Sequence, residues 1–444
     1  MRRTIVQKQS MKITDFHSLL DTASSEESHT PIVLNGRELQ ELVSPMPSDE
    51  FVNSYFSRVS LDVEGHPQKF EHIFGWERLR QALARGQHIR DRRYNLTASF
   101  AGGEESGSSR RMMEAHHNQV VELLNAGATI CVTNIHMADP FLARWAQAIR
   151  TQLNFTGTVG VNCYVSADGS GLPMHYDKRV ATTLQIAGKK RWRFSVESAK
   201  TWPDTNEVYQ EGQVKENVGK LPSEMEFREV ELKPGDMLCL PAGAWHSARG
   251  VGFSLALNLY FAPRNLFDQL APLLQDFATS NENWRGGPPA TTEKIQGNMP
   301  KTVAAYMRER LNEFHKMALE AIDGPDALGE PWMRSLILSP YTGWQPDPML
   351  PIPGITPDQR FCVAMSSLRF IEIEDKIIIP CDNVVLKFPA KLAPTLRRLS
   401  AESVSFTIPE ILSWQQQPED PAPNEIMTYL QALYMNRIIK MVNS

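Results

Sequence analysis

The five cysteines of this 444-residue chain are few and widely separated, and no two of them have Cys-x-x-Cys spacing. An odd number without that spacing argues against a disulfide framework and favours reduced thiols in a cytoplasmic setting. The sequence also lacks any run of about 18 apolar residues, so we expect no membrane-spanning helix. Arg2 and Arg3 are followed by no sustained apolar segment, so no signal peptide is expected.

Positive charge is not in excess either. The chain has 46 Lys and Arg against 51 Asp and Glu, a formal net charge of −5. A protein that grips duplex DNA mainly through its phosphates is usually basic, so nucleic acid is not an expected partner. The sequence contains no Rossmann glycine fingerprint, no P-loop and no Gly-x-Ser-x-Gly motif. These absences exclude the commonest nucleotide-binding and serine-hydrolase signatures.

The hydrophobic pattern predicts an α+β chain. From Val159 onward, short strand-like runs, among them ATTLQIAG and KRWRFSV, are separated by Gly and Pro, as in a small antiparallel barrel or sandwich. Helical periodicity is expected in 111–125 and in 139–153, where Asp139-Pro140 is a typical helix start, and it returns after Pro263. We therefore divide the chain into an N-terminal lead-in with helical support (1–127), a β-rich core (128–263), a helical region (264–342), a Pro-rich linker (343–358) and a C-terminal module (359–444).

Two of these regions have more than one interpretation. In the helical region, apolar residues from Val303 to Ala321 repeat at intervals of three and four, which is one stripe of an amphipathic helix. That stripe could pack within the chain or form a homodimer. The C-terminal module mixes strand-like and short helical segments, which suits a winged-helix unit. Its residues 384–444 include six Lys or Arg and five Asp or Glu, so no DNA-reading face is expected.

One group of residues points to metal chemistry. His175 and Asp177 lie in GLPMHYD and are two residues apart, so on a β-strand their side chains point to the same face. His246, in LPAGAWH, begins a later strand-like segment and can complete the set. Two histidines and one carboxylate are the ligands of non-haem Fe(II) oxygenases. His-x-Asp alone is a weak signal; the Gly-rich turn before it and the Pro-Gly turn before His246 strengthen it.

A lysine follows this group in the sequence at a separation that has a chemical explanation. Lys190 lies 15 residues after His175, in GKKRWRF. A 2-oxo diacid that chelates iron through its keto-acid end leaves a distal carboxylate, which needs a counter-charge and hydrogen bonds. Lys190 can supply the charge and Tyr164 a hydroxyl, while Asn162 and Asn258 can offer amide donors. The alternative is that Lys190 belongs to an exposed cationic strand edge and that Asn258 merely satisfies backbone groups.

The same segments carry a family resemblance. NCYVSADGSGLPMHYD, LQIAGKKRWRF and LPAGAWHSA resemble the JmjC-type oxygenases of the cupin superfamily, and GATICVTNIH (127–136) is similar to the lead-in of their ribosomal oxygenase branch. The resemblance spans about 128–265. It implies a double-stranded β-helix, or jelly-roll, as the catalytic core, followed by a helical dimerisation region and a C-terminal winged helix.

The resemblance also implies roles for individual residues. His175, Asp177 and His246 match the iron triad, and Lys190 matches the lysine that pairs with 2-oxoglutarate. Asn162 and Tyr164 match an Asn-x-Tyr pair in the same pocket. The implied activity is a 2-oxoglutarate-dependent dioxygenase that uses Fe(II) and O2 to hydroxylate a protein or peptide side chain, with ribosomal proteins among the candidate substrates. 2-Oxoglutarate would be decarboxylated to succinate and CO2.

This sequence departs from the branch just after the triad. Where relatives usually have a HYDxxxVFxLQ pattern, it has HYDKRVATTLQ, so Lys178, Arg179, Thr182 and Thr183 change the expected pocket rim. The substrate is therefore not implied by the resemblance. Alternatives are the same chemistry on a free amino acid, a natural-product peptide or a methyl-lysine. A further alternative is a non-catalytic cupin sensor whose winged helix binds a partner.

Overall fold

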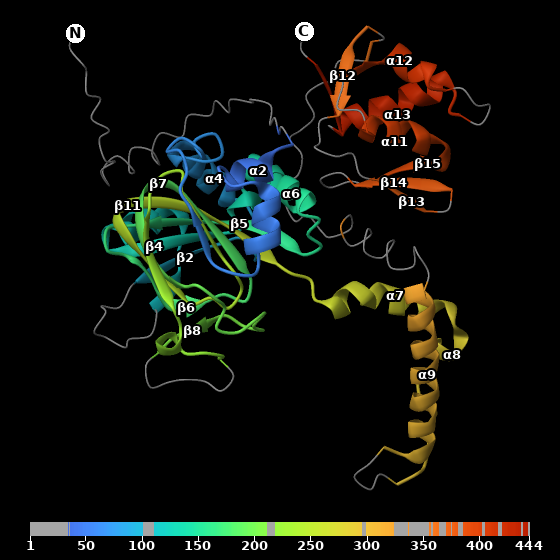
Figure 1. Ribbon diagram of the computed structural model, residues 1–444, viewed down its shortest axis with the longest axis horizontal. Coiled ribbons are helices and arrows are strands. Elements are labelled where there is room, and N and C mark those ends of the chain that lie inside the picture. Colours follow the sequence, from blue (N-terminus) through green and yellow to red (C-terminus); the bar gives the residue numbers. More distant parts are fainter. Residues whose placement is uncertain are drawn as a thin grey trace.

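The computed structural model describes residues 34, 36–100, 111–210, 218–294, 299–323 and 336, and most of 355–442 (Figure 1). The first 33 residues of the predicted lead-in and nearly all of the predicted Pro-rich linker lie outside this part. Within it, no helix has the length and apolar character needed to cross a membrane.

The core is an antiparallel sheet of 11 strands folded as a jelly-roll, which confirms the predicted β-rich core within an α+β chain. Its main path runs β1-β10-β7-β11-β5-β4-β2-β3, while β6 and β8 extend from β11 and β9 pairs with β7. The strands are β1 (Leu61–Val63), β2 (Asn95–Phe100), β3 (Arg111–Glu114), β4 (Ala128–Thr133), β5 (Thr158–Ser166), β6 (Gly171–Tyr176), β7 (Val180–Ser195), β8 (Glu207–Val208), β9 (Phe227–Leu232), β10 (Met237–Leu240) and β11 (His246–Ala262).

The two long strands β7 and β11 join the two faces of the jelly-roll. The sequence pattern had suggested two separate strands, ATTLQIAG and KRWRFSV, but the structure shows β7 as one strand through Gly188. Gly188 has φ +64, and a Cβ there would lie 2.0 Å from the carbonyl oxygen of Phe253. Glycine thus bends the strand against β11 without ending it, because only glycine adopts this conformation at no steric cost.

The sheet also extends beyond the segment predicted for it. Strands β1, β2 and β3 come from residues before Ala128, in the region expected to give helical support only. Residues 111–125 were expected to be helical; they begin with strand β3 and are helical from His117 onward, in η2 and α5. Alternation in such short strands is too brief to distinguish from a helical pattern.

Helices cover the open side of the sheet. The predicted helix start at Asp139-Pro140 is confirmed: Asp139 accepts a hydrogen bond from Leu142 N at 2.9 Å, and Pro140 occupies the first helical position. Trp145 and Ile149 of this helix lie in the main core. The helical segments here are α2 (Glu38–Val43), α3 (Ser48–Glu50), η1 (Phe51–Tyr55), α4 (Trp76–Gly86), η2 (His117–Gln119), α5 (Val120–Asn125), η3 (Ile135–Met137), α6 (Pro140–Gln152) and η4 (Pro222–Glu224).

Beyond the jelly-roll, the predicted helical region contains α7 (Leu266–Ser280), α8 (Glu282–Arg285) and α9 (Lys301–Asp323), which form an arm beside the barrel (Figure 1). The indole nitrogen of Trp284 donates to Glu313 at 2.7 Å and ties α8 to α9. The arm therefore has its own internal contacts.

The C-terminal module has a separate hydrophobic core and two small sheets, β16-β12-β17 and β13-β14-β15. Its elements are β12 (Arg360–Val363), β13 (Ile371–Ile373), β14 (Lys376–Pro380), β15 (Val385–Pro389), η5 (Ala390–Leu392), α11 (Ala393–Ala401), β16 (Phe406–Thr407), α12 (Ile408–Ser413), α13 (Pro423–Met435) and β17 (Ile439–Met441).

Candidate metal centre and its pocket

Strand pairing brings together the three residues that the sequence singled out as metal ligands. His175 lies near the end of β6 and pairs across the sheet with His246, the first residue of β11. Asp177 follows β6 directly. One potential ligand atom from each of the three lies within 4.8 Å of the others. The two imidazole rings are 4.2 Å apart between centroids.

Backbone carbonyl groups orient both imidazoles in the same way. Nδ1 of His175 lies 2.8 Å from the carbonyl oxygen of Pro173, and Nδ1 of His246 lies 2.9 Å from that of Ala244. Each Nδ1 therefore carries the proton and donates it to a carbonyl, which leaves the lone pair on Nε2. Such partners fix the tautomer and orientation of metal-binding histidines.

A tight turn positions Asp177 against the segment that leads into His246. The backbone N of Gly243 donates to the carbonyl oxygen of Asp177 at 2.8 Å. Gly243 has φ +82, and a Cβ there would lie 1.9 Å from the carbonyl oxygen of Lys200. Gly243, the glycine of LPAGAWH, is therefore required for two reasons: its φ is positive, and there is no space for a side chain.

The donor set suits a divalent transition metal. His246 is 5% exposed, and burial lowers its pKa, although the nearby carboxylate of Asp177 opposes this shift. A lowered pKa keeps the imidazole neutral, which is the form that binds metals. Two neutral nitrogens and one carboxylate are typical of facial Fe(II) sites that keep positions open for other ligands.

Lys190 is separated from its cationic neighbours by the alternation of β7. Lys189 and Arg191 face outward, where Nζ of Lys189 pairs with Glu231 of β9 at 3.0 Å. Lys190 points inward, is 4% exposed, and its Nζ lies 5.5 Å from the ring centroid of Tyr164. The exposed-edge interpretation therefore holds for the neighbours of Lys190 but is wrong for Lys190.

The charge of Lys190 has no acidic partner among the described residues. Burial lowers its pKa to about 8, and the thiols of Cys163 and Cys131 only partly oppose this shift. A buried cation without a counter-charge is costly, so this position favours an anionic ligand.

Tyr164 lies in the same interior, where burial raises the pKa of its phenol well above its usual value. A hydrogen bond with Cys131 contributes to that shift. Cys131 of β4 pairs directly with Tyr164 of β5 in the sheet register. Sequence reasoning missed Cys131 as a pocket residue, because only the strand register places it there.

The two predicted asparagines are hydrogen-bonded to side chains or loop backbone. Asn162 and Asn258 face each other across β5 and β11. The side-chain oxygen of Asn162 accepts from the backbone N of Asn134 at 3.0 Å, and Nδ2 of Asn258 donates to the Thr183 hydroxyl at 3.3 Å. Of the other predicted rim residues, Thr182 is fully buried and bonds to Cys239, so it does not form the rim.

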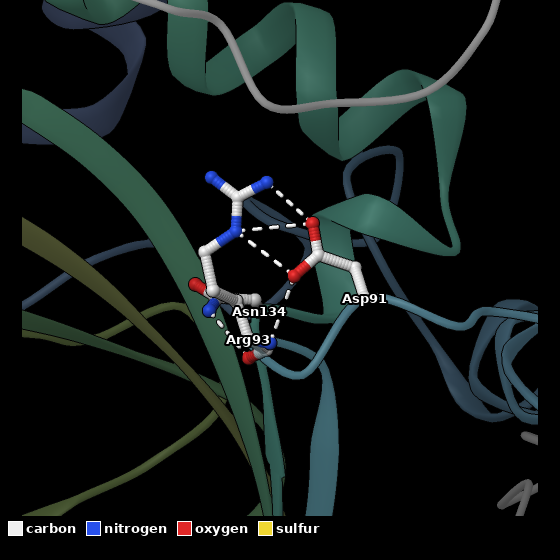
Figure 2. A network of polar contacts seen from close by, with 3 residues as sticks. All are labelled: Asp91, Arg93 and Asn134. Carbon is white, nitrogen blue, oxygen red and sulfur yellow. Dashed lines mark hydrogen bonds and ion pairs between the residues drawn. The ribbon is translucent and has the colours of Figure 1, made fainter.

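A second polar group, also missed from the sequence, surrounds Asn134 (Figure 2). Arg93 is held by Asp91, with its Nε 3.0 Å from both carboxylate oxygens, and its carbonyl oxygen accepts from Nδ2 of Asn134 at 2.7 Å. Asn134 has φ +55, and its side-chain oxygen accepts from the Tyr260 hydroxyl at 2.6 Å. Arg179 lies over the Tyr260 ring, 3.9 Å from its centroid. Only three-dimensional contacts reveal this group, since its members come from four segments.

Three further side chains of types that could serve a metal site or its walls have structural explanations instead. Trp245 packs in a small core with Tyr176 and donates its indole proton to the carbonyl of Lys220 at 2.8 Å, so it is a packing residue. His136 is 4% exposed, and its Nδ1 accepts from the backbone N of Val161 at 3.1 Å. His117 stacks on Tyr94 and is not part of a metal-binding group among the described residues.

Several known proteins are similar to this chain in sequence. A family model described as JmjC domain matches residues 135–267. The chain is 24% identical over 262 residues to the Uncharacterized protein YxbC of Bacillus subtilis (strain 168), covering 56% of this chain and 77% of that protein. It is 32% identical over 154 residues to Ribosomal oxygenase 2 of Rattus norvegicus, covering 33% of this chain but only 31% of that protein.

A solved structure resembles almost the whole chain. The X-ray structure of E. coli ycfD has a TM-score of 0.54 and 14% sequence identity, covering 90% of this chain and 99% of that one. Another structure of YcfD, described as a ribosomal oxygenase in complex with cobalt and 2-oxoglutarate, has a TM-score of 0.51 at 14% identity. At this identity the likeness establishes the shared fold.

Proposed function

We propose that this chain, in which residues 135–267 match a JmjC domain, is an Fe(II)- and 2-oxoglutarate-dependent oxygenase that hydroxylates a side chain of a protein or peptide. One observation carries the proposal: Tyr164 links a His-Asp-His group to a buried lysine that has no acidic partner among the described residues. The charge of Asp177 acts on the Tyr164 phenol, and Nζ of Lys190 lies 5.5 Å from the centroid of the Tyr164 ring. The His-Asp-His group suits a divalent iron and the lysine suits the distal carboxylate of the cosubstrate.

In this proposal each pocket residue has a defined task. His175, Asp177 and His246 would hold iron through Nε2, a carboxylate oxygen and Nε2. Lys190 would bind the distal carboxylate of 2-oxoglutarate, and the Tyr164 hydroxyl would donate a hydrogen bond to it. Bound iron, with 2-oxoglutarate and O2, supplies oxidative decarboxylation to succinate and CO2 and the transfer of one oxygen atom to the substrate.

Two further residues shape the walls of the same pocket. Asn162 and Asn258 would contribute amide groups on the neighbouring strands, in a geometry already limited by their bonds to Asn134 and Thr183. The buried walls exclude water from the reacting centre. The chain would thus bind and orient iron, 2-oxoglutarate and the substrate, and keep water away from the reacting centre.

The substrate class is the part of the proposal that rests most on relatives. Matched proteins named ribosomal oxygenases make ribosomal proteins the first substrates to test. Intact-mass spectrometry of the reacted substrate distinguishes the chemistries: hydroxylation adds one oxygen atom, whereas demethylation of a methyl-lysine removes a methyl group. The same measurement on free amino acids and modified peptides covers the remaining alternatives.

The direct test is an anaerobic titration of the apoprotein with Fe(II) and 2-oxoglutarate, followed by visible spectroscopy. We expect a metal-to-ligand charge-transfer band that requires both additions. Iron binding without the band would indicate a metal cupin of another kind. No metal binding at all would reject the proposed enzyme and favour a sensor or scaffold.

We also propose that the arm formed by α7 and α9 mediates a homodimer. Several apolar side chains of the arm are strongly exposed, with Phe267 at 70% and Leu311 at 60%. Exposed apolar surface of this kind marks interaction sites. Light scattering should give twice the monomer mass, and Leu311→Asp should lower it; a monomeric wild-type protein would refute the dimer.

The C-terminal module is best interpreted as a winged-helix-like unit that docks a protein partner. It combines three helices with the small β13-β14-β15 meander. Some of its cations are neutralised locally, as Lys391 is by Glu425 at 2.7 Å. Salt-dependent binding of duplex DNA at physiological ionic strength would contradict this role.

A further inference from the structure

We propose that Arg93, Asn134, Arg179 and Tyr260 form the mouth of the metal pocket, and that Arg179 receives there an anionic side chain of the substrate, a carboxylate in the first instance. This inference rests on the proposed function, because it names the substrate class of that same site. It follows from where Arg179 lies, from the charges around it and from how rigidly it is supported.

Arg179 is close to Asp177 in the chain and to Tyr260 in the fold. It follows Asp177 by two residues and immediately precedes β7, whose Ala181 pairs with Tyr260. Its guanidinium stacks on the Tyr260 ring at 3.9 Å. The charges of both Asp177 and Arg179 act on the pKa of the Tyr164 phenol, in opposite directions. Arg179 is therefore close enough to influence groups in the interior.

The charge of Arg179 is unmatched, unlike that of the other arginine near Tyr260. Arg93 is paired with Asp91, which it holds at a pKa of about 2 (Figure 2). Among the described residues no carboxylate forms an ion pair with Arg179, which is half-buried. A half-buried guanidinium that stacks on an aromatic ring keeps its hydrogen-bond donors available for a ligand.

The loaded site would not neutralise Arg179. A divalent iron with the Asp177 carboxylate, together with the 2-oxoglutarate dianion opposite Lys190, is balanced in charge. The positive charge of Arg179 then remains at the mouth. An approaching anion would gain a charge-assisted hydrogen bond, whereas an arginine or lysine side chain would meet a like charge in a partly desolvated place.

The surface beneath Arg179 is preorganised. The Tyr260 ring lies over Gly160, where a Cβ would be 2.5 Å from the Tyr260 hydroxyl oxygen. That hydroxyl is fixed by the side-chain oxygen of Asn134 at 2.6 Å. Gly160 leaves room for the Tyr260 ring, and Asn134 fixes the hydroxyl group of that ring. The guanidinium therefore stacks on a ring that has little freedom to move. Preorganisation of this kind improves selectivity because less ordering is required on binding.

The test measures binding and turnover with a panel of matched peptides. Fluorescein-labelled decapeptides of Ala, Gly and Ser carry one central Asp, Glu, phosphoserine, Asn or Arg. Fluorescence anisotropy with the full chain gives their affinities with and without Co(II) and 2-oxoglutarate. Succinate release by the Fe(II)-loaded protein reports which peptides stimulate turnover. Arg179→Gln and Arg179→Glu are compared with Lys189→Gln, which alters an exposed cation on the outer face of β7.

We expect the wild-type protein to bind Asp or Glu peptides at least roughly tenfold more tightly than the Arg peptide, in line with one charge-assisted contact. Arg179→Gln should abolish that preference, Arg179→Glu should reverse it, and Lys189→Gln should preserve it. A preference for phosphoserine over Asp and Glu would retain the anion but change its source. Tyr260→Phe, which keeps the ring and frees its tip, should reduce the preference only in part.

Three results would overturn the inference. One is equal affinity for all peptides, including no binding of any; another is a preference for Arg that survives Arg179→Gln. The third is a loss of 2-oxoglutarate affinity in Arg179→Gln as large as the loss for the Asp peptide, which would assign Arg179 to the cosubstrate. Failure of the proposed function is separate, since it would appear as a wild-type protein with no charge-transfer band.

Discussion

The interior of the pocket and its mouth are held in place in different ways. In the interior, backbone carbonyls orient His175 and His246, and strand register alone turns Lys190 inward. At the mouth, contacts made by side chains join separate segments. Asn134 accepts from the Tyr260 hydroxyl and also donates to the Arg93 carbonyl, as Figure 2 shows. One group depends on the main chain of the jelly-roll, and the other depends on side-chain contacts.

This difference suits the interior residues to the chemistry and the mouth residues to substrate selectivity. Groups fixed by the backbone of a sheet cannot change position without altering the fold, which suits ligands of a metal and a cosubstrate. Groups fixed by side chains can be replaced one at a time while the sheet is preserved, which suits recognition of different substrates. The comparison predicts that interior variants lose binding of metal or 2-oxoglutarate, while mouth variants change substrate preference.

The largest effect should come from His175→Ala. Removing one of three ligands should lower metal affinity by more than the roughly 100-fold that the loss of a supporting residue can cost, and should abolish turnover. Calorimetric titration with Co(II) measures the first and succinate release the second. His88→Ala, which removes an exposed histidine, is the control. Retained turnover in His175→Ala would reject the triad.

The next effect concerns Lys190→Met, which keeps the volume of the buried side chain but removes its charge. Losing one partner of a buried charge pair costs about 2–5 kcal/mol, so 2-oxoglutarate should bind at least roughly 30-fold more weakly. The charge-transfer band under anaerobic titration gives the affinity. Lys189→Met removes the exposed neighbour that pairs with Glu231 and should bind normally. Equal affinities in the two variants would show that Lys190 does not contact the cosubstrate.

The same lysine predicts a pH dependence. In the ligand-free protein, burial lowers the pKa of Lys190 to about 8, and only its protonated form attracts a carboxylate. Affinity for 2-oxoglutarate should therefore be constant below pH 8 and fall by up to about tenfold per pH unit above it. A carboxylate in the pocket raises this pKa, so the complex should lose its proton only at higher pH.

The measurement is the affinity for 2-oxoglutarate from pH 6.5 to 9.5, with Lys190→Met as the reference for changes in iron coordination. The difference between the two proteins should disappear as the pH rises, since the wild-type lysine becomes neutral. A wild-type profile parallel to that of Lys190→Met would mean that another group controls the binding.

The sequence predicted the interior better than the mouth for a physical reason. His175 and Asp177 are linked by the two-residue period of a strand, and Lys190 follows in the next strand, so local patterns contain the relevant information. Tyr260 and Asn134 are 126 residues apart, and no local pattern relates them. Arg179 was flagged as a rim residue, but its stacking on Tyr260 depends on strand register.

The bounds of the strands and helices show the same limit of prediction from local sequence patterns. The long strand β11 and helix α6 were predictable because their patterns are long or well capped. Strand β7 was divided in two at Gly188, since a glycine usually ends a strand-like run. Its φ of +64 serves a bend between the two faces instead. That role depends on the carbonyl of Phe253, which the local sequence does not reveal.

The smallest predicted effect tests whether the main chain positions the triad. Gly243 and Gly252 both have positive φ, +82 and +70, so alanine at either should cost about 1–2 kcal/mol of stability. A Cβ at Gly252 meets nothing within 4 Å, whereas at Gly243 it lies 1.9 Å from the Lys200 carbonyl oxygen. Gly243→Ala should therefore displace the turn that donates to Asp177 and lower Co(II) affinity by roughly tenfold or more, as for other residues that support metal ligands.

Thermal unfolding and Co(II) calorimetry on the two variants separate strain from positioning. Gly252→Ala should lower Tm by a few degrees and leave metal affinity unchanged, because its strain is local to an exposed bend of β11. Equal Co(II) affinities in the two variants would mean that Asp177 keeps its place without the bond from Gly243. The interior would then depend on its own side-chain contacts, as the mouth does, and the contrast between the two would not hold.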